Sequence, residues 1–414
     1  MTRLGCVADD FTGATDLAGN LVATGRRTVV TLGVPETVPA GADAVVVALK
    51  TRTAPPGDAV DATLAAHRAL HAAGLHRTWF KYCSTFDSTD HGNIGPVIDA
   101  LLDATGAPWT IACPAFPANG RTVYQGHLFV GDRLLSESGM RHHPLTPMTD
   151  PDLVRVLAAQ TRHRTGLLPH AVLKDGPGAA RRRLDALAAD GVRIVVTDTL
   201  DDADLAVIER ATRDLRLVTG GSGLALALPP QRPRAAAARI DTAPGPMAVL
   251  AGSVSDATLG QIAHARKTLP HRRLDADDLL AAPAATVEAA VRWAAPRLGA
   301  GQDVLLYSAD DRGQVRAAQA AHGPERAAAA VERALALCAR ELAERGVRRI
   351  LVAGGETAGA VVGELGVRLL HIGPAIAPGV PWTAAEYGGG SLNLALKSGN
   401  FGGEDLFTTA GEAL

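Results

Sequence analysis

Residues 4–24, LGCVADDFTGATDLAGNLVAT, predict how the chain begins to fold. Leu4–Ala8 is a short apolar run that is typical of a buried strand, and a helical pattern covers residues 14–24. The polar, glycine-containing turn at residues 9–13 joins the two. A buried strand that passes through a short turn into a helix is the repeating unit of α/β folds, so the start of the chain already indicates this class.

The same alternation continues through the first half of the chain. Helical patterns at residues 58–73 and 94–104 separate short apolar runs that we interpret as strands. Strand–helix alternation predicts a largely parallel sheet that is covered by helices. The runs interpreted as strands are 28–32, 44–49, 78–82, 110–113, 171–174, 193–198 and 215–219.

A proline-bounded segment, LPPQRPRAAAARIDTAPGP at residues 228–246, interrupts the alternation. It lacks apolar periodicity, so we interpret residues 229–246 as a linker between two domains, 1–228 and 247–414. We therefore predict an α/β protein of two domains, each with a largely parallel sheet flanked by helices. In the second domain the expected strands are 247–251, 303–307 and 349–353, and the expected helices are 255–268 and 324–345.

Composition excludes several classes of protein. The 414 residues are 47% hydrophobic and 20% charged, which is typical of globular proteins. A formal net charge of −2 provides no basic field, so we expect neither a nucleic-acid nor a membrane partner. The four cysteines form no Cys-x-x-Cys pair, and the first residues do not read as a signal peptide. These features predict a cytoplasmic protein with reduced thiols.

Acidic residues crowd the turn that follows the first predicted strand. Asp9 and Asp10 directly follow this strand, and Asp16 lies in the predicted helix. Ligands of open α/β sheets bind at the carboxyl ends of strands, where a carboxylate can accept the proton of an attacking hydroxyl. Thr12 adds a hydroxyl, and Gly13 permits a close approach of the backbone to a ligand. A simple helix N-cap is the alternative, although three carboxylates are more than a cap needs.

A second polar stretch, KYCSTFDSTDHGN at residues 81–93, follows another predicted strand. A small polyhydroxy acid needs a cation for its carboxylate and paired donors and acceptors for its hydroxyls. The alternative is a polar loop that caps the following helix. The candidate substrate-binding residues here are Lys81, Ser84, Asp87, Ser88 and Asn93, joined by Arg52 from an earlier strand end.

The stretch CPAFPANGRTVYQGHLFVGDRLLSESG, residues 113–139, is long and rich in glycine and proline. Long loops in compact domains are often functional. Arg121, Tyr124, Gln125 and His127 are polar groups that can face a substrate or a subunit partner. A structural β-hairpin is the alternative interpretation.

Glycine- and serine-containing turns recur in the second domain. Such turns at helix starts expose backbone N–H groups that bind phosphate. The chain contains no G-x-x-x-x-G-K-[ST] sequence, so a P-loop is excluded. Several such turns in one domain favour a nucleotide. They lie at 252–255, 354–357 and 397–402.

Taken together, these segments resemble the four-carbon acid sugar kinase family over almost the whole chain. The resemblance rests on GCVADDFTGATDLA near the start, TGGSGLA at residues 219–225, and AGSVSDATLGQI, LVAGGETAGAVV and LKSGNFGGEDLF in the second domain. The stretch KYCSTFDSTDHGNIGPV departs from the general family pattern and is similar to the branch that acts on 3-oxo-tetronate.

The resemblance implies an ATP-dependent kinase that phosphorylates the terminal hydroxyl of a four-carbon sugar acid. It implies that the first domain binds the sugar acid and the second binds ATP, with Mg²⁺ neutralising the transferred group. Asp10 is favoured as the catalytic base, with Asp9 and Asp16 as competitors. The residues that match the family's ATP-binding positions are Ser255, Gly354, Gly355, Glu356, Thr357 and Gly399.

Several alternatives remain open at this stage. A kinase for threonate or erythronate would carry the same motifs. A non-catalytic sugar-acid or nucleotide sensor is the alternative from another class, although Asp9, Asp10 and Asp16 are all retained. The sequence leaves the metal ligands unassigned and is compatible with a homodimer.

Overall fold

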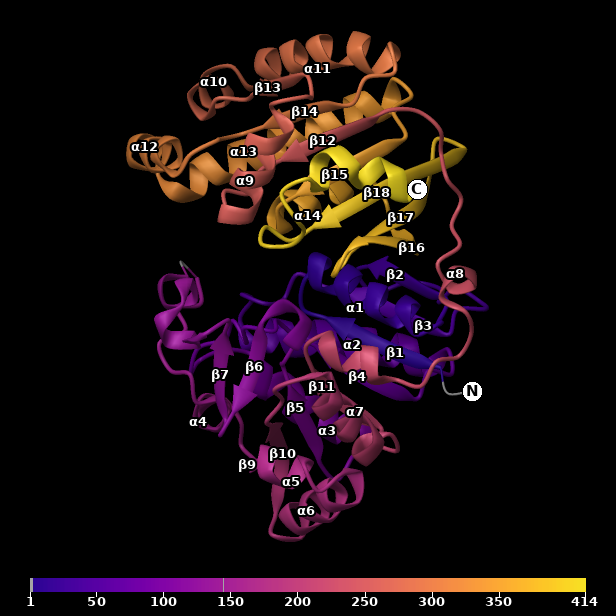
Figure 1. The fold of residues 1–414 in the computed structure, drawn as a ribbon, viewed down its shortest axis with the longest axis vertical. Helices are drawn as coiled ribbons and strands as arrows, with labels where there is room; N and C mark the ends of the chain where they lie inside the picture. Colours follow the sequence, from indigo (N-terminus) through magenta and orange to yellow (C-terminus); the bar gives the residue numbers. More distant parts are fainter. Residues whose placement is uncertain (1–2, 144) are drawn as a thin grey trace. The chain divides into compact units, whose positions relative to one another are not determined.

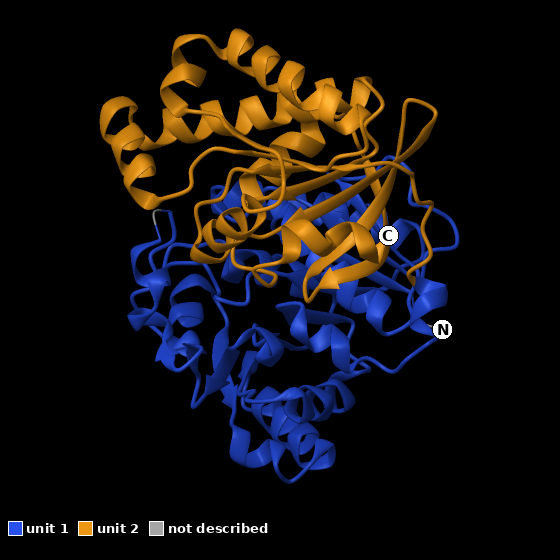
Figure 2. Ribbon diagram, turned by 45° about the horizontal axis from the view of Figure 1, so that its top comes forward, with its two compact units in different colours: residues 1–237 blue, residues 238–414 orange. Residues whose placement is uncertain are grey.

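In a computed structural model, described for residues 3–143 and 145–414, the chain forms two compact units (Figure 2). Unit 1 is Met1–Ala237 and unit 2 is Ala238–Leu414, so the division falls within the proline-rich segment 229–246. Both units are built from strands and helices that alternate along the chain, which confirms the predicted α/β class (Figure 1).

Unit 1 contains a large sheet, a small sheet and the helices between their strands. Its strands are β1 (Leu4–Ala8), β2 (Thr28–Leu32), β3 (Ala44–Ala48), β4 (Arg77–Lys81), β5 (Thr110–Cys113), β6 (Arg121–Tyr124), β7 (His127–Val130), β8 (Arg133–Leu134), β9 (Arg164–Leu168), β10 (Val192–Thr197) and β11 (Leu217–Gly220). Its α-helices are α1 (Phe11–Ala23), α2 (Pro56–Ala72), α3 (Ile94–Thr105), α4 (Leu153–Gln160), α5 (His170–Leu173), α6 (Pro177–Ala189), α7 (Asp202–Thr212) and α8 (Arg234–Ala237). Short 3₁₀ helices are η1 (Pro117–Asn119), η2 (Leu135–Glu137), η3 (Gly139–His142) and η4 (Gly223–Ala227).

The strands of the large sheet in unit 1 pair in the order β2-β3-β1-β4-β11-β5-β10-β9. These pairings are parallel, and β1 lies between β3 and β4. All five residues of β1 are buried, as expected for a strand covered on both faces. Parallel strands end at the same edge of a sheet, so the segments that follow β1, β3, β4, β5 and β11 gather at one edge.

Local sequence explains where the helices of unit 1 begin and end. The Asp10 side chain caps α1 by accepting a hydrogen bond from the backbone N–H of Gly13. Pro56 opens α2, where its missing N–H costs nothing. Gly106 closes α3 with a left-handed backbone, which glycine adopts without strain.

One region of unit 1 differs from the expectation, and the stretch at 113–139 adopts the β-hairpin alternative. Residues 171–174 were expected to form a strand, but α5 occupies them and the strand of this region is β9. The apolar run is short enough to suit either structure, and Pro169 directly before it favours a helix start. The stretch at 113–139 forms the small antiparallel sheet β6-β7-β8, flanked by η1 and η2.

Unit 2 repeats the strand–helix alternation and ends in antiparallel strands. Its strands are β12 (Met247–Ala251), β13 (His271–Arg273), β14 (Val304–Tyr307), β15 (Arg349–Ala353), β16 (Leu369–Ala377), β17 (Val380–Tyr387) and β18 (Gly390–Lys397). Its helices are α9 (Asp256–Ala265), α10 (Ala276–Ala281), α11 (Pro283–Gly299), α12 (Arg312–His322), α13 (Pro324–Glu344), α14 (Gly355–Glu364), α15 (Leu406–Thr409) and the 3₁₀ helix η5 (Ala410–Ala413).

The strands of unit 2 pair in the order β13-β14-β12-β15-β18-β17-β16. The pairings from β13 to β18 are parallel, whereas β17 pairs antiparallel with both β18 and β16. The sequence did not identify this antiparallel part, because its glycine-rich turns obscure the strand pattern. A core that includes Trp382, Phe407 and Ile262 packs against these strands.

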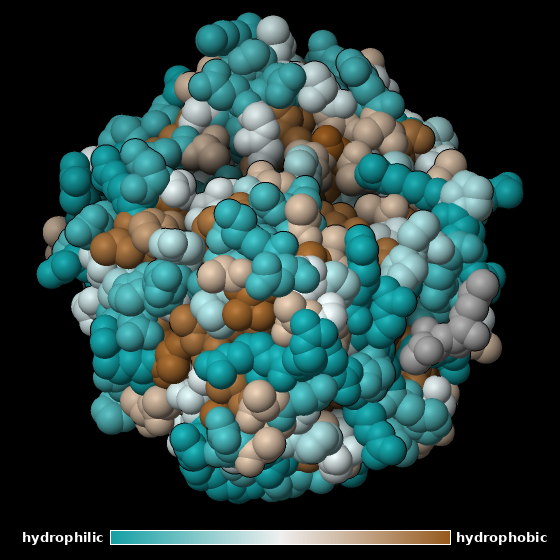
Figure 3. Space-filling model, turned by 60° about the horizontal axis from the view of Figure 1, so that its bottom comes forward, coloured by the Kyte–Doolittle hydropathy of each residue, from teal (hydrophilic) through white to brown (hydrophobic). Residues whose placement is uncertain are grey.

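Apolar residues on the surface are dispersed. Figure 3 shows hydrophobic residues interspersed with hydrophilic ones on the face that it presents. The large hydrophobic residues that are exposed come from separate segments: Val34, Tyr124, Leu145, Leu200 and Leu226. Among residues 3–143 and 145–414, the helices are all too short or too polar to cross a membrane.

Candidate active site

Arg52 is the centre of a charge cluster at the carboxyl edge of the sheet in unit 1. Its Nε and Nη2 atoms donate to the two carboxylate oxygens of Asp9, each at 2.9 Å. Nη2 also lies 2.7 Å from Oδ1 of Asp10, and Nη1 lies 3.6 Å from Oδ2 of Asp87. One guanidinium group therefore holds three carboxylates that would otherwise repel one another.

Asp10 combines a structural role with an accessible carboxylate. Its oxygens accept hydrogen bonds from the Gly13 backbone N–H at 3.0 Å and the Thr12 hydroxyl at 2.9 Å. Burial opposes ionisation of Asp10, but the charges of Arg52 and Lys81 outweigh it and lower its pKa. The Asp10 side chain is 24% exposed, whereas that of Asp9 is 4% exposed. Asp10 is thus ionised at neutral pH and still reachable.

Gly13 makes room for the close approach of Lys81 to Asp10. The Lys81 Nζ atom lies 3.8 Å from Asp10 Oδ1. A Cβ atom at Gly13 would lie 2.1 Å from both of these atoms, so a larger residue would displace them. Burial alone would lower the pKa of Lys81. The negative charges of Asp10 and Asp9 raise the pKa by more than burial lowers it, so the ammonium group stays charged.

Asp16 lies at the same edge and carries a different kind of carboxyl group. Its Oδ2 accepts a 2.5 Å hydrogen bond from the Ser222 hydroxyl, which follows β11. Its Oδ1 is buried and has no hydrogen-bond partner within the protein. Burial raises the pKa of Asp16, which Lys81 and Ser222 only partly offset. Burial likewise raises the pKa of Asp9 despite the Arg52 charge.

The polar stretch after β4 brings Asp87 to this cluster. Phe86 and Asp87 both have positive φ angles, 65° and 47°, in a region that non-glycine residues rarely occupy. The Thr85 hydroxyl donates to Asp87 at 2.7 Å, and buried Phe86 anchors the turn in the core. This strained turn aims Asp87 at Arg52.

Two other predicted residues of this stretch hold neighbouring segments. The Asn93 amide donates to the carbonyl oxygens of Thr51 at 2.7 Å and Ala54 at 3.1 Å, and so braces the loop that carries Arg52. The Ser88 hydroxyl accepts from the Gln160 side chain at 3.0 Å. Ser84 is partly buried. Direct substrate contact by these residues stays a prediction.

In unit 2, the predicted glycine turns contact one another. Ser255 caps α9, and its hydroxyl donates to the Gly399 carbonyl at 2.5 Å. Gly354, with a φ of 129°, precedes α14, and a Cβ atom there would lie 3.2 Å from the backbone nitrogen of Ser253. Gly355 and Glu356 are exposed at the start of α14, and Thr357 is buried behind them. Two helix starts and a glycine turn therefore converge, which suits an anionic phosphate.

Lys397, at the end of β18, is buried beneath these turns with 0% exposure. Its Nζ atom donates to the carbonyl oxygens of Gly399 at 2.7 Å and Ser398 at 3.0 Å, and to the Thr258 hydroxyl at 3.0 Å. Burial lowers the pKa of Lys397 to about 7. The lysine thus orders the 398–399 turn, and its charge is sensitive to pH near neutrality.

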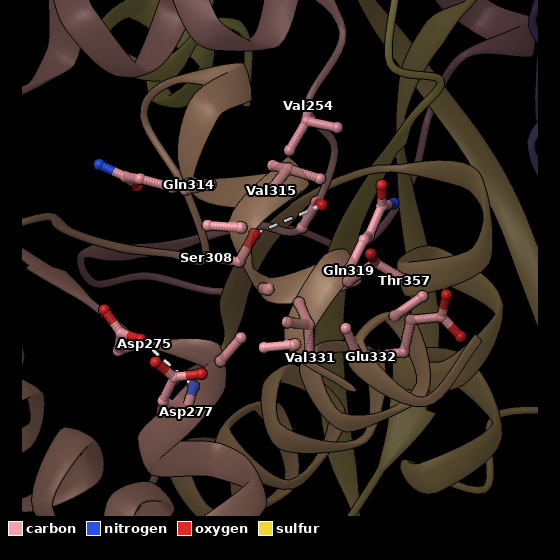
Figure 4. Close-up of a pocket in the computed structure, with 18 residues that line it drawn as sticks. Val254, Asp275, Asp277, Ser308, Gln314, Val315, Gln319, Val331, Glu332 and Thr357 are labelled. Carbon is pink, nitrogen blue, oxygen red and sulfur yellow. Dashed lines mark hydrogen bonds between the residues drawn. The ribbon is translucent and has the colours of Figure 1, made fainter. Parts of the chain in front are cut away.

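A cavity of about 480 Å³ adjoins the glycine turns in unit 2. Gly252 and Thr357 belong to both the turns and the cavity wall. Figure 4 shows Ser308 bonded to Gly252 in this wall, with Val315 and Thr357 nearby. Further lining comes from apolar residues such as Val254 and Val331. A largely apolar wall beside turns that suit phosphate also suits the base of a nucleotide.

Metal-binding side chains do not cluster in the described part of the chain. Within residues 3–143 and 145–414, no three His, Cys, Asp or Glu side chains gather in a way that could hold a metal ion. Mg²⁺ is commonly bound by one or two carboxylates together with substrate phosphates, so this finding is compatible with a Mg²⁺-nucleotide.

Comparison with known proteins matches both units. A family model described as a sugar-binding N-terminal domain matches residues 4–228, and one described as a nucleotide-binding C-terminal domain matches residues 248–407. A 3-oxo-tetronate kinase of Cupriavidus necator is 52% identical over 98% of this chain and 96% of the relative. One of Burkholderia multivorans is 54% identical over 99% of this chain and 97% of the relative.

Solved structures agree with these matches. A crystal structure from Salmonella typhimurium LT2 aligns with a TM-score of 0.90 at 44% identity, covering 99% of both chains. A Haemophilus influenzae protein aligns with a TM-score of 0.81 at 41% identity, again covering 99% of both chains. A sugar-binding unit followed by a nucleotide-binding unit is the organisation of a two-domain sugar kinase. The chain belongs to the four-carbon acid sugar kinase family.

The structure brings most of the predicted residues into two groups. Contacts and shared charges gather Asp9, Asp10, Thr12, Gly13, Asp16, Arg52, Lys81 and Asp87 in unit 1. In unit 2, contacts join Ser255 to Gly399, and Gly354 and Thr357 lie at the adjacent turn. The sequence analysis did not single out Ser222 or the cavity wall. A serine within TGGSGLA after a strand was the available signal for Ser222, whereas the alanine-rich helices of the wall carried none.

Replacing Gly399 tests the nucleotide turns. In Gly399→Ala the new Cβ would lie 2.5 Å from the Ser253 hydroxyl and 3.0 Å from that of Ser255, so the contact between turn and helix start must open. We expect the KM for ATP to rise about tenfold while the KM for the sugar acid stays constant. Gly260→Ala is the control, because its Cβ meets nothing closer than 3.9 Å. An unchanged KM for ATP in Gly399→Ala would place the phosphates elsewhere.

The pKa of Lys397 predicts a pH-dependent contribution to stability. The ordinary lysine pKa is 10.5, and burial lowers it to about 7 in the folded protein. Between these values the unfolded chain binds more protons, so the free energy of unfolding rises with pH. Relative to Lys397→Met, the wild type should therefore gain stability from pH 7 to pH 10 in denaturant titrations. Exposed Lys267→Met is the control. The prediction would be contradicted if the difference in the free energy of unfolding between the wild type and Lys397→Met did not change with pH.

Proposed function

We propose that the protein transfers the terminal phosphoryl group of ATP to the 4-hydroxyl of 3-oxo-tetronate and yields the 4-phosphate. The observation that carries this proposal is identity above 50% over nearly the full length to 3-oxo-tetronate kinases of Cupriavidus necator and Burkholderia multivorans. The charge cluster in unit 1 and the glycine turns in unit 2 support the same reaction, because it needs a sugar-acid site and a phosphate site.

We assign the nucleotide to unit 2. The convergent helix starts supply backbone N–H groups for the phosphates, at Ser255 and at 354–357, and Gly399 completes the cradle. The adjoining cavity has room for the adenosine part. When bound, Mg-ATP supplies the phosphoryl group, and the metal neutralises part of its charge.

We assign the sugar acid to unit 1 and the role of general base to Asp10. A hydroxyl is a weak nucleophile at neutral pH, so a carboxylate that orients it and accepts its proton late in transfer promotes the reaction. Asp9 has both oxygens bonded to Arg52, and Asp16 is buried and bonded to Ser222. Asp10 has the most exposed side chain of the three carboxylates around Arg52, at 24% against 4% for Asp9 and 8% for Asp87. Lys81 beside it offsets the negative charge near the acceptor hydroxyl.

The proposed substrates and setting follow from the same assignment. The enzyme would act on small metabolites in the cytoplasm, without a nucleic-acid or membrane partner. A homodimer stays a prediction that size-exclusion chromatography with light scattering would test.

A substrate panel tests the proposed function. ADP release would be measured with 3-oxo-tetronate, threonate and erythronate as acceptors, with Mg²⁺ and ATP present. We expect kcat/KM to be highest for 3-oxo-tetronate, by at least about tenfold over the other acids. A higher kcat/KM for threonate or erythronate would show that the protein is a kinase of the same family with a different substrate. The absence of ADP release with every acid would favour a non-catalytic sensor.

Replacing Asp10 tests the assigned base. Asp10→Asn removes the proton acceptor, yet asparagine caps helices as well as aspartate does, so α1 should remain intact. We expect kcat to fall by roughly 10²–10⁴-fold with little change in the KM for ATP. Exposed Asp90→Asn, in the polar stretch at residues 81–93, is the control. Near-normal turnover by Asp10→Asn at saturating substrate would reject Asp10 and move the role to Asp9 or Asp16.

A further inference from the structure

The charge balance at the sugar-acid site leaves a question about how an anionic substrate binds. Arg52 is the central cation, but its nitrogens already face Asp9, Asp10 and Asp87. Lys81 lies 3.8 Å from Asp10, so its charge is largely balanced as well. A sugar acid that brings a further negative charge needs a cation that is not held by carboxylates.

Arg121 meets this requirement at the same edge of the sheet. It follows β5 through a tight loop, and paired backbone hydrogen bonds with Phe116, at 2.8 and 3.1 Å, fix its position. Its Nη1 atom donates to the carbonyl oxygen of Asn119. Its Nε atom is buried and has no hydrogen-bond partner within the protein. No described ion pair joins Arg121 to an acidic residue, so its charge remains available.

Two further buried polar atoms of this region have no hydrogen-bond partner within the protein. The side-chain nitrogen of Asn119 is buried without a hydrogen-bond partner, as is Oδ1 of Asp16, whose residue is 5% exposed. The charge of Arg121 acts on Asp16. Packing connects the two residues: Ser222 bonds to Asp16, and a Cβ atom at neighbouring Gly223 would lie 3.0 Å from Cα of Phe116, the partner of Arg121. Buried polar atoms normally have partners, so this region has hydrogen-bonding capacity that the protein itself leaves unused.

We propose that Arg121, assisted by the amide of Asn119, binds the carboxylate of the sugar acid and sets the preference of the enzyme for an acid over a neutral four-carbon ketose. A guanidinium group is planar and presents paired N–H donors that match a carboxylate. This inference rests on the proposed function and adds the residues that recognise the acid group.

Comparing an acid with its neutral analogue tests this assignment. Erythrulose matches 3-oxo-tetronate except that a CH₂OH group replaces the carboxylate. Dissociation constants of both compounds would be measured by calorimetry for the wild type and Arg121→Met. We expect Arg121→Met to weaken binding of 3-oxo-tetronate about 100-fold and that of erythrulose less than about threefold, because only the acid loses an ion pair. Asn119→Ala should weaken acid binding about tenfold.

Controls separate recognition from folding. Exposed Arg133→Met lies in the same small sheet and should bind both compounds normally. Arg121→Lys keeps the charge without the planar fork and should give an intermediate loss. Equal weakening of both compounds by Arg121→Met would reveal a merely structural role and overturn the proposal. Unchanged acid binding in Arg121→Met, with loss of acid preference in Lys81→Met, would assign the carboxylate to Lys81 instead.

Failure of the Arg121 assignment can be distinguished from failure of the proposed function. Turnover of 3-oxo-tetronate by the wild type tests the function itself. If the wild type phosphorylates 3-oxo-tetronate and Arg121→Met keeps the full preference for the acid, the function stands and the role of Arg121 is rejected.

Discussion

The bond between Arg52 and the carboxylates of Asp9 and Asp10 is the interaction on which the charge cluster in unit 1 depends. Adjacent carboxylates at a strand end repel each other, and burial of Asp9 makes its charge costly. A bidentate guanidinium removes both problems at once and leaves Asp10 ionised and partly exposed. Asn93 holds the loop that carries Arg52, so this amide also determines where the guanidinium and its carboxylates lie.

Close backbone approach is the corresponding constraint in unit 2. The turns at 252–255, 354–357 and 398–399 can contact one another only where side chains are absent or very small. Lys397 orders one of these turns from below through bonds to carbonyl oxygens. A buried lysine without a described acidic partner is costly, yet it adds positive potential beneath turns that suit phosphate. Burial of Lys397 therefore lowers the stability of the folded protein, while its ammonium group lies close to turns that suit an anion.

Sequence patterns predicted elements well where the pattern is strong. Fully buried parallel strands such as β1 and β12 read as continuous apolar runs, and proline or glycine delimits α13. Patterns failed where a short run suits either structure, as at α5, or where glycine-rich turns hide antiparallel strands, as in β16–β18. In these places long-range pairing, rather than local preference, decides the structure.

The sequence by itself determined the α/β class and the polar segments that follow the strands, and it predicted a domain boundary in the proline-rich segment, because strand periodicity and turn chemistry are local properties. Only the tertiary structure decided which of these segments meet. Sheet order places Ser222, 206 residues along the chain, against Asp16, and the fold around Phe116 fixes Arg121. It also distinguishes three similar aspartates, since burial and partners differ for Asp9, Asp10 and Asp16. Such differences arise from contacts between distant segments, which no local pattern records.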